Sequence, residues 1–344
     1  MSLQTYFTKF HDNIKLTSAT KKELSNKRDI LIGILRDSGK LPSFEEFSQG
    51  SYGMFLGIKP ADDEEYDIDV GLRFNVSKDD YRPLEIKDTI YEILKGHTEY
   101  GAKIRKPCVT VTYKKDGEKS YHVDLVTYSY EDKDDFDGQM YLAKGTDTSP
   151  EDEVLWEKAD PVALLDYIRD TVQDESEREQ FRRIVKYIKH WKKRKFSSSG
   201  HAEPPSIGIT LLVLDNFVAS DGDDLSALIH AVDAIKSEFH FEGVDNNRFM
   251  YSISYSLPDS LRVEPGNNVF EKMSLVQMTD FKDKIEKLSR DLLAVQGEAD
   301  LVKQCEKLRN VFGDDFEAPE AKDVSKQQMN YIPRSTASGN EYGL

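Results

Sequence analysis

The sequence predicts a mixed α/β protein, with a sheet in its first half and helices in its second. Apolar and polar residues alternate from Tyr66 to Phe74, which is the period of a half-buried strand. A second alternating run, 109–113, is followed by the residues Lys-Lys-Asp-Gly at 114–117, and Asp-Gly is typical of a tight hairpin. Later apolar residues recur at spacings of three and four, as in amphipathic helices. We therefore expect a sheet within residues 45–130 and a helical region behind it.

Helical spacing recurs along the chain, and each helix is expected where an apolar stripe is flanked by polar residues. The segments with this pattern are Lys21–Asp37, Thr89–Leu94, Ser176–Phe196, Thr279–Leu293 and Asp300–Val311. Ser176-Glu177-Arg178-Glu179 has the pattern of a capping box and predicts the start of the third helix. The acidic stretch from Tyr130 to Gly145 is interpreted as a solvated loop.

Three aspartates have the spacing expected of a metal-dependent active site. Asp67 and Asp69 lie two residues apart on the predicted strand, on the face opposite its apolar residues. The strand that returns from the hairpin, 119–127, places Asp124 on the face opposite Val123 and Leu125. If this hairpin lies beside the first acidic strand, the three carboxylates share one cleft, which is unfavourable without a bound cation.

Carboxylate oxygens are the ligands that Mg²⁺ prefers, and two ions about 3.5–4 Å apart can stabilise both the attacking and the leaving oxygen of an in-line displacement. We therefore predict that Asp67, Asp69 and Asp124 are catalytic residues and ligands of two Mg²⁺ ions, with Mn²⁺ as a substitute. Asp124 is expected nearest the nucleophile. An Asp-x-Asp pair alone is usually a solvated edge strand, so the prediction depends on the conjunction of all these features.

A Gly-Ser turn precedes the acidic strand, in the segment Gln49-Gly50-Ser51. Glycine allows the backbone to approach a phosphate closely, and exposed amides with the serine hydroxyl can hold the β- and γ-phosphates. Gln49, Gly50 and Ser51 are therefore predicted to bind a nucleoside triphosphate, whose α-phosphate a hydroxyl then attacks. A Gly-Ser pair alone is an ordinary turn in most proteins.

With these motifs, the chain resembles the DNA polymerase β-like nucleotidyltransferase superfamily, and more narrowly the bacterial CD-NTases of CBASS anti-phage defence. The resemblance rests on motifs spread over residues 1–317, namely Phe47-Ser48-Gln49-Gly50-Ser51, Tyr66-Asp67-Ile68-Asp69, His122-Val123-Asp124-Leu125, the helix Arg182–Trp191, Pro205-Ser206-Ile207-Gly208 and Val311–Phe316. It implies that Lys189 contacts the nucleotide, with Lys186 as the alternative. It also implies that Ser206 contacts the donor phosphates, although this serine could simply cap the helix that follows it.

The resemblance implies a two-lobed cage with a central cleft: a polymerase β-like core with a mixed sheet, and a helical C-terminal lobe. The expected parts are a catalytic core with an N-terminal spanning helix at 1–165, a helical lobe at 166–317 and a polar tail at 318–344. It further implies an enzyme that joins nucleoside triphosphates, ATP among them, into a cyclic di- or trinucleotide that activates an effector protein. The alternative is a nucleotidyltransferase that makes linear oligonucleotides or modifies a protein, an RNA or a small molecule.

Two departures from the family limit this inference. Family members often carry a threonine five residues after the motif serine, where this chain has Leu56. The zinc thumb of metazoan cyclic GMP-AMP synthase is not expected, since the only cysteines are Cys108 and Cys305. Both departures weaken any transfer of base preference or of activation by DNA.

Composition restricts the classes of partner that this protein is expected to bind. The 344 residues include 63 Asp and Glu against 47 Lys and Arg, a net charge of −16, which disfavours a broad nucleic-acid surface, so no DNA partner is expected. The first residues resemble no signal peptide and the longest apolar run is too short to span a bilayer, so we expect a bacterial cytoplasmic protein with no membrane contact. An operon-encoded ancillary protein acting on the C-terminal tail is a further hypothesis from the resemblance.

Overall fold

The computed structural model describes residues 2–60, 65–113, 121–197, 199–258, 261 and 268–319. The helices of this part of the chain are α1 (Leu3–Ile14), α2 (Ser18–Asp37), α3 (Gly50–Gly53), α4 (Pro83–Leu94), α5 (Pro161–Asp170), α6 (Glu175–Lys195), α7 (Ser206–Asp215), α8 (Asp224–Ser237), α9 (Leu275–Gln296) and α10 (Leu301–Phe312). The strands are β1 (Phe44–Ser48), β2 (Tyr66–Ser77), β3 (Ala102–Ile104), β4 (Val109–Tyr113), β5 (Tyr121–Tyr130), β6 (Met140–Ala143), β7 (Trp156–Ala159), β8 (Phe239–Asp245) and β9 (Arg248–Ile253).

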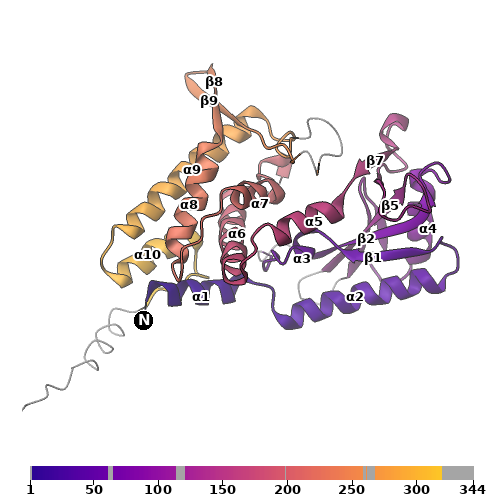
Figure 1. Cartoon of the computed structure of the whole chain (residues 1–344), viewed down its shortest axis with the longest axis horizontal. Coiled ribbons are helices and arrows are strands. Elements are labelled where there is room, and N and C mark those ends of the chain that lie inside the picture. The colour runs from indigo at the N-terminus through magenta and orange to yellow at the C-terminus, as the bar shows by residue number, and fades with distance from the viewer. Residues whose placement is uncertain are drawn as a thin grey trace, which may run out of the picture.

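These elements form two lobes that lie side by side (Figure 1). In one lobe, α2 and α4 pack against the sheet, and apolar side chains from all three fill one core. In the other lobe, α6 to α10 surround a separate core. The mixed α/β architecture predicted from the alternating strands and the later helical spacing is therefore confirmed.

The large sheet has the strand order β1-β2-β5-β4-β3, with β6 paired to β5 and to β7. Strands β2 and β5 are parallel, whereas β1 with β2 and β4 with β5 are antiparallel pairs. The predicted hairpin is thus present as β4 and β5, beside the first acidic strand. Its turn, at Asp116-Gly117, lies outside the described residues.

The alternation of β2 is confirmed, since the side chains of Ile68, Val70, Leu72 and Phe74 are all fully buried. This apolar face belongs to the core beneath α2 and α4. Burial of about 25 cal/mol for each Å² of apolar surface fixes which face of a strand is inside, because a slip of one residue would expose the whole set. The opposite face of β2, which carries the acidic residues, is thereby directed away from that core.

The first helix belongs structurally to the helical lobe, not to the sheet. Phe7 and Phe10 of α1 are fully buried, and the ring of Phe10 stacks on Tyr187 of α6 at 5.0 Å between centroids. Phe10 also contacts Phe312, at 4.8 Å. Helix α2 then crosses to the sheet lobe (Figure 1). The first 37 residues therefore connect the two lobes.

Two local predictions are wrong. Helix α6 begins at Glu175 with Asp174 as its N-cap, because the Asp174 carboxylate accepts bonds from the amides of Ser176 and Glu177 at 2.9 and 3.0 Å. The capping box at Ser176 is therefore not formed. The stretch from Tyr130 to Gly145 is not all loop, since β6 occupies Met140–Ala143 and pairs with β5.

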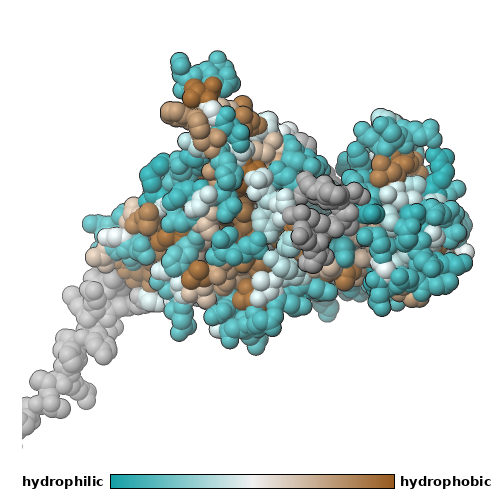
Figure 2. Space-filling view, turned by 45° about the horizontal axis from the view of Figure 1, so that its top comes forward, coloured by the Kyte–Doolittle hydropathy of each residue, from teal (hydrophilic) through white to brown (hydrophobic). Residues whose placement is uncertain are grey.

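The end of the helical lobe agrees with the sequence pattern. Helix α9 is longer than predicted and α10 is shifted by one residue, and the two are separated at Gly297, which caps α9. The β8–β9 hairpin projects from this lobe (Figure 1), and in Figure 2 its tip is hydrophilic with hydrophobic residues just beneath it. Of the predicted polar tail, all but Ala318 and Pro319 lies outside the described residues. No helix in the described ranges is long and apolar enough to cross a bilayer.

Candidate active site

Parallel pairing of β2 with β5 brings the three predicted aspartates to neighbouring positions. Asp69 lies directly opposite Asp124 in the register, and Asp67 lies opposite His122. Adjacent strands are about 4.8 Å apart, and residues two apart on a strand share a face. Asp67, Asp69 and Asp124 therefore occupy the same face of the sheet, the one turned away from the core beneath α2 and α4.

The Gly-Ser turn packs directly against Asp69. Gly50 has φ +59°, and a Cβ atom there would lie 1.9 Å from the Asp69 Oδ2 atom. The backbone amide of Gln49 donates to the carbonyl oxygen of Asp69 at 3.1 Å, which fixes the start of the turn. Only glycine fits this position without displacing the carboxylate.

The turn forms the short helix α3, whose hydrogen bonds include one from the Gly53 amide to the Gln49 carbonyl, at 3.0 Å. Helix geometry leaves the amides before that bond without an intrahelical acceptor. The turn can therefore offer the Gly50 and Ser51 amides, with the Ser51 hydroxyl, to an anion.

A cavity of about 250 Å³ joins residues of both lobes. Five of the predicted site residues line it: Ser51, Asp67, Asp69, Lys189 and Ser206. Glu65 and Lys193 line it as well, whereas Asp124 lies next to Asp69 on β5 and is not part of the wall. The cavity therefore combines the acidic face of the sheet with cationic side chains of α6.

Two carboxylates of this face, Asp67 and Asp69, resist ionisation. Burial, followed by the negative charges of Asp67 and Asp124, raises the pKa of Asp69 to about 7. Burial and then Asp124 also raise the pKa of Asp67 above its ordinary value, and Lys189 opposes this shift. Bringing these groups together as anions is costly unless a cation compensates them.

This donor set fits Mg²⁺, which takes carboxylate oxygens and completes its octahedron with water or phosphate oxygens. In the ranges that the structure describes, no group of three His, Cys, Asp or Glu side chains forms a preformed metal site. Asp67, Asp69 and Asp124 would therefore hold the ions together with oxygens from water and substrate. That incomplete set is typical of Mg²⁺ sites that include substrate phosphates.

Lys189 reaches from α6 into the cavity, as the resemblance implied. Its Nζ atom donates to the carbonyl oxygen of Leu56 at 2.8 Å, and its side chain is buried. Burial, with the nearby charges of Lys192 and Lys193, lowers the pKa of Lys189 to about 7. Lys186, the alternative, lines a different cavity, beside His11.

Ser206 and Gln49 are near the cavity but have partners of their own. Ser206 is the first residue of α7, and its Oγ atom accepts a bond from Lys192 Nζ at 2.8 Å. The Gln49 Oε1 atom accepts a bond from the hydroxyl of Tyr128 at 3.0 Å. Their predicted contacts with nucleotide stay predictions.

Sequence reasoning missed Thr110. This β4 residue lies opposite Asp124, and its Oγ1 atom donates to Asp124 Oδ1 at 2.6 Å. The predicted hairpin did not carry the signal, because counting back from a two-residue turn at Asp116-Gly117 pairs Thr110 with Val123, one position before the observed partner. Thr110 therefore fixes the orientation of the third aspartate.

Comparison with known proteins gives matches at the level of sequence and of fold. Residues 44–128 match the family model described as cyclic GMP-AMP synthase DncV-like, nucleotidyltransferase domain. A cyclic GMP-AMP synthase of Escherichia albertii is 27% identical over 218 residues, which is 59% of this chain. The match spans 44% of that relative's own length.

Solved structures of the DncV cyclic AMP-GMP synthase of Vibrio cholerae share the fold. One of them covers 92% of this chain and 97% of its own, with a TM-score of 0.67 and 16% identity. Another, in complex with nonhydrolyzable GTP, has a TM-score of 0.68 and 16% identity, and covers 89% of this chain and 93% of its own. A third holds the linear intermediate 5′ pppA(3′,5′)pG and has a TM-score of 0.67 and 16% identity, over 89% and 93% of the two chains.

Proposed function

Because residues 44–128 form a DncV-like nucleotidyltransferase domain, we propose that this protein condenses nucleoside triphosphates into a cyclic di- or trinucleotide. The observation that carries the proposal is the cavity lined by Ser51, Asp67, Asp69 and Lys189. It places acids suited to a metal–triphosphate complex opposite a buried lysine, and the similar DncV structures include complexes with GTP and with a linear dinucleotide.

The reaction forms one bond and breaks one. The hydroxyl oxygen of an acceptor nucleotide attacks the α-phosphorus of the donor, the bond to the β-phosphate bridging oxygen breaks, and pyrophosphate leaves with that oxygen. Two Mg²⁺ ions bound at Asp67, Asp69 and Asp124 would stabilise the charge on the attacking and leaving oxygens. A second round within the same cavity closes the linear product into a ring.

The side chains have distinct roles. Ser51 and the backbone of its turn bind the β- and γ-phosphates, and Lys189 neutralises part of the charge on the triphosphate. Thr110 engages Oδ1 of Asp124, which leaves the second carboxylate oxygen to accept the proton of the attacking hydroxyl. Cyclisation would yield a second messenger for CBASS signalling, read by a separate effector protein.

The experiment is product identification. The purified protein is incubated with Mg²⁺ and the four nucleoside triphosphates, each labelled in turn at the α-phosphate, and the products are treated with phosphatase and separated by chromatography. A cyclic product has no terminal phosphate, so phosphatase leaves its chromatographic mobility unchanged, whereas a linear product loses its terminal phosphates and elutes at a new position. If no labelled product keeps its mobility after phosphatase with any combination, cyclisation is wrong.

A second function is favoured by the extent of the family match, which covers the nucleotidyltransferase core but none of the helical lobe. This leaves the acceptor open to a linear oligonucleotide, a protein, an RNA or a small molecule. The same assay separates the two functions, because label on a macromolecule or on a phosphatase-sensitive oligonucleotide identifies the second.

A further inference from the structure

A second cavity, of about 400 Å³, lies where α1, α2 and α6 meet the segment after α3. The chain as a whole is strongly acidic, but this cavity is cationic. Four basic side chains line it, Lys15, Lys21, Arg182 and Lys186, together with His11 and a single carboxylate, that of Glu179.

Two of the four cations have carboxylate partners and two have none among the described residues. Arg182 pairs with Glu179, and Lys15 pairs with Asp12, each at 2.5 Å. Lys21 and Lys186 make no ion pair within the described ranges, and Lys186 Nζ lies 3.5 Å from His11 Nε2.

Lys186 is buried, and burial, with the charges of Lys21, Arg182 and Lys15, lowers its pKa to about 8 against the opposing effect of Glu179. The pKa of His11 is lowered to about 4, by burial and then by Lys186. Like charges gathered in a partly dry cavity are unfavourable without a counterion. The cavity thus gathers positive charges in the way that the sheet face gathers the negative charges of the catalytic acids.

The cavity shares a wall with the active site. Leu16 and Gly57 line both cavities, while Tyr52 and Phe55 face the cationic one and Ser51 faces the catalytic one. Phe55 has φ +61° and is half exposed, and the Arg169 and Arg182 guanidinium groups lie 5.2 and 4.8 Å from its ring centroid. A bulky residue in the left-handed region of backbone conformation is strained. Its surroundings therefore hold this segment in place.

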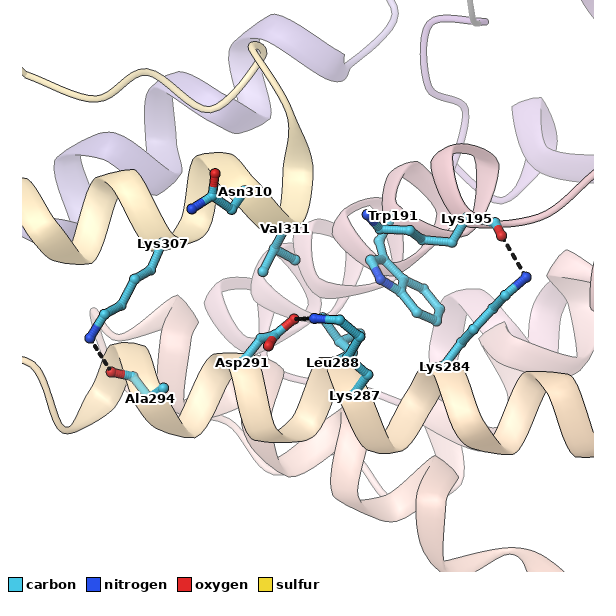
Figure 3. A pocket seen from close by; sticks show the side chains of 10 residues that line it. All are labelled: Trp191, Lys195, Lys284, Lys287, Leu288, Asp291, Ala294, Lys307, Asn310 and Val311. Atoms are coloured by element: carbon cyan, nitrogen blue, oxygen red, sulfur yellow. Dashed lines mark hydrogen bonds and ion pairs between the residues drawn. The ribbon is translucent and has the colours of Figure 1, made fainter.

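A third cavity, of about 560 Å³ between α6, α9 and α10, also contains lysines, and three of them have a bonded ammonium group (Figure 3). Lys284 donates to the Lys195 carbonyl at 2.6 Å, and Lys287 pairs with Asp291 at 2.7 Å. Lys307 donates to the Ala294 carbonyl at 3.0 Å. This cavity therefore has the same residue types with most of its ammonium groups already engaged, which makes it a control.

We infer that the cavity lined by Lys15, Lys21, Arg182 and Lys186 is a second anion site, which binds a small polyphosphate on the far side of the Ser51–Gly57 segment from the catalytic aspartates. Three or more charged phosphate oxygens would engage the lysines as point charges, which suits a compact anion. Because the wall is shared, an anion bound there also restrains the segment that presents Ser51.

Binding is tested with inorganic tripolyphosphate as the probe, in EDTA so that no divalent cation supports binding at the aspartates. Calorimetric titration compares the wild type with Lys15→Gln/Lys21→Gln and with Lys284→Gln/Lys287→Gln, which removes the same charge from the cavity of Figure 3. Lys193→Gln tests binding in the catalytic cavity. We expect the dissociation constant to rise at least tenfold in the first variant, about 1.4 kcal/mol, and less than twofold in the other two.

Equal weakening in both double variants would overturn the site in favour of general attraction to lysines, and weakening in Lys193→Gln alone would place the anion in the catalytic cavity. Amide hydrogen exchange distinguishes binding in this cavity from a general effect of the protein's charge. Tripolyphosphate should slow exchange at residues 52–57 in the wild type and in Lys284→Gln/Lys287→Gln, but not in Lys15→Gln/Lys21→Gln. All these tests are independent of catalysis, so they can fail while the proposed function holds.

Discussion

Two aspartates, the half-buried Asp69 in the sheet lobe and the fully buried Asp224 in the helical lobe, have opposite electrostatic surroundings. Asp224 is fully buried and accepts two bonds from Arg183, both at 2.8 Å, and one from Tyr187 at 2.9 Å. Burial alone would raise the pKa of Asp224, but the bonds and charge of Arg183 outweigh it and the net shift is downward. Asp69 instead lies beside two further carboxylates, and its pKa rises to about 7.

The two acids differ in how their negative charge is compensated. The charge of Asp224 is compensated within the fold, whereas that of Asp69 would be compensated by a bound ligand. The partners of Asp224 come from its own lobe, so its charge is compensated as soon as that lobe folds. The charge of Lys189 lowers the pKa of Asp69, but burial and the repulsion of Asp67 and Asp124 outweigh it. Removing the first charge should therefore harm stability, whereas removing the second should harm only function.

The strongest test of this contrast is Asp67→Asn with Asp69→Asn. We expect product formation to fall at least ~10³-fold, because the metal ligands are lost. In Mg²⁺-free buffer at pH 8 the free energy of unfolding should rise by about 1–3 kcal/mol, because repulsion is relieved. Labelled-triphosphate assays and urea unfolding measure the two effects. Asp134→Asn with Asp137→Asn, two exposed acids, is the control, and retained synthesis in the test variant would overturn the site.

Asp224→Asn should have the opposite profile. It leaves Arg183 without its carboxylate, and breaking one side of a buried ion pair costs about 3 kcal/mol or more. Urea unfolding measures the loss, with the exposed Asp221→Asn as the matched control, for which we expect less than about 0.5 kcal/mol. A variant as stable as the wild type would remove the distinction between the two acids.

Gly50→Ala probes the contact between the turn and Asp69. The added methyl would displace the Asp69 carboxylate and would sit at a positive φ, so we expect kcat to fall by about 100-fold, or ~2.7 kcal/mol. Gly39→Ala is the control, because Gly39 also has a positive φ but no atom within 4 Å of its Cβ position. Similar losses of activity in both variants would show that backbone strain, not the carboxylate, is responsible.

The raised pKa of Asp69 predicts a pH dependence of metal binding. A proton competes with Mg²⁺ below a pKa of about 7, so the Mg²⁺ concentration that gives half of the thermal shift should fall about fivefold from pH 6 to pH 7 and less above it. Without metal the folded protein becomes more stable as pH falls, because protonation of a carboxyl whose pKa is raised in the folded state favours that state. Stability from this group therefore grows as pH falls through 7. Asp67→Asn/Asp69→Asn should lose both effects, and a flat Mg²⁺ response across this range would contradict the prediction.

Thr110→Val should have the smallest effect of the set. It removes the hydrogen bond to Asp124 without changing side-chain shape, and we expect kcat to fall by about 5–10-fold, or ~1 kcal/mol. Thr110→Ser keeps the hydroxyl and should recover most of the rate. If Ser and Val behave alike, the hydroxyl does not position Asp124.

Sequence reasoning could identify the acidic face because period-two alternation fixes which way each aspartate points. The confirmed burial of Ile68 and Val70 on one side of β2 left Asp67 and Asp69 on the other. It could also predict the hairpin, but not the residue that lies opposite Asp124. The predicted family resemblance is confirmed by the match of residues 44–128.

What the sequence could not reveal are relations set by tertiary packing. The cap of α6 was misplaced by two residues, because Asp174 and Ser176 are both good N-caps and only the backbone decides between them. The separation of Lys186 from Lys189 into two cavities depends on how α6 is rotated against α1. The buried network of Asp224 escaped notice, because Arg183 lies 41 positions earlier in the chain and no local pattern joins them.

The bond from Lys189 to the carbonyl of Leu56 spans the boundary between the lobes. Neither half of this molecule therefore contains the whole candidate site: one carries the acids, and the other carries the lysine that lines the same cavity. If the chain were divided within α5, neither fragment alone should catalyse synthesis. Any synthesis by the mixture would show that the two fragments had reassembled. The same dependence means that a motion separating the halves by a few ångströms would switch the chemistry off without touching a single aspartate.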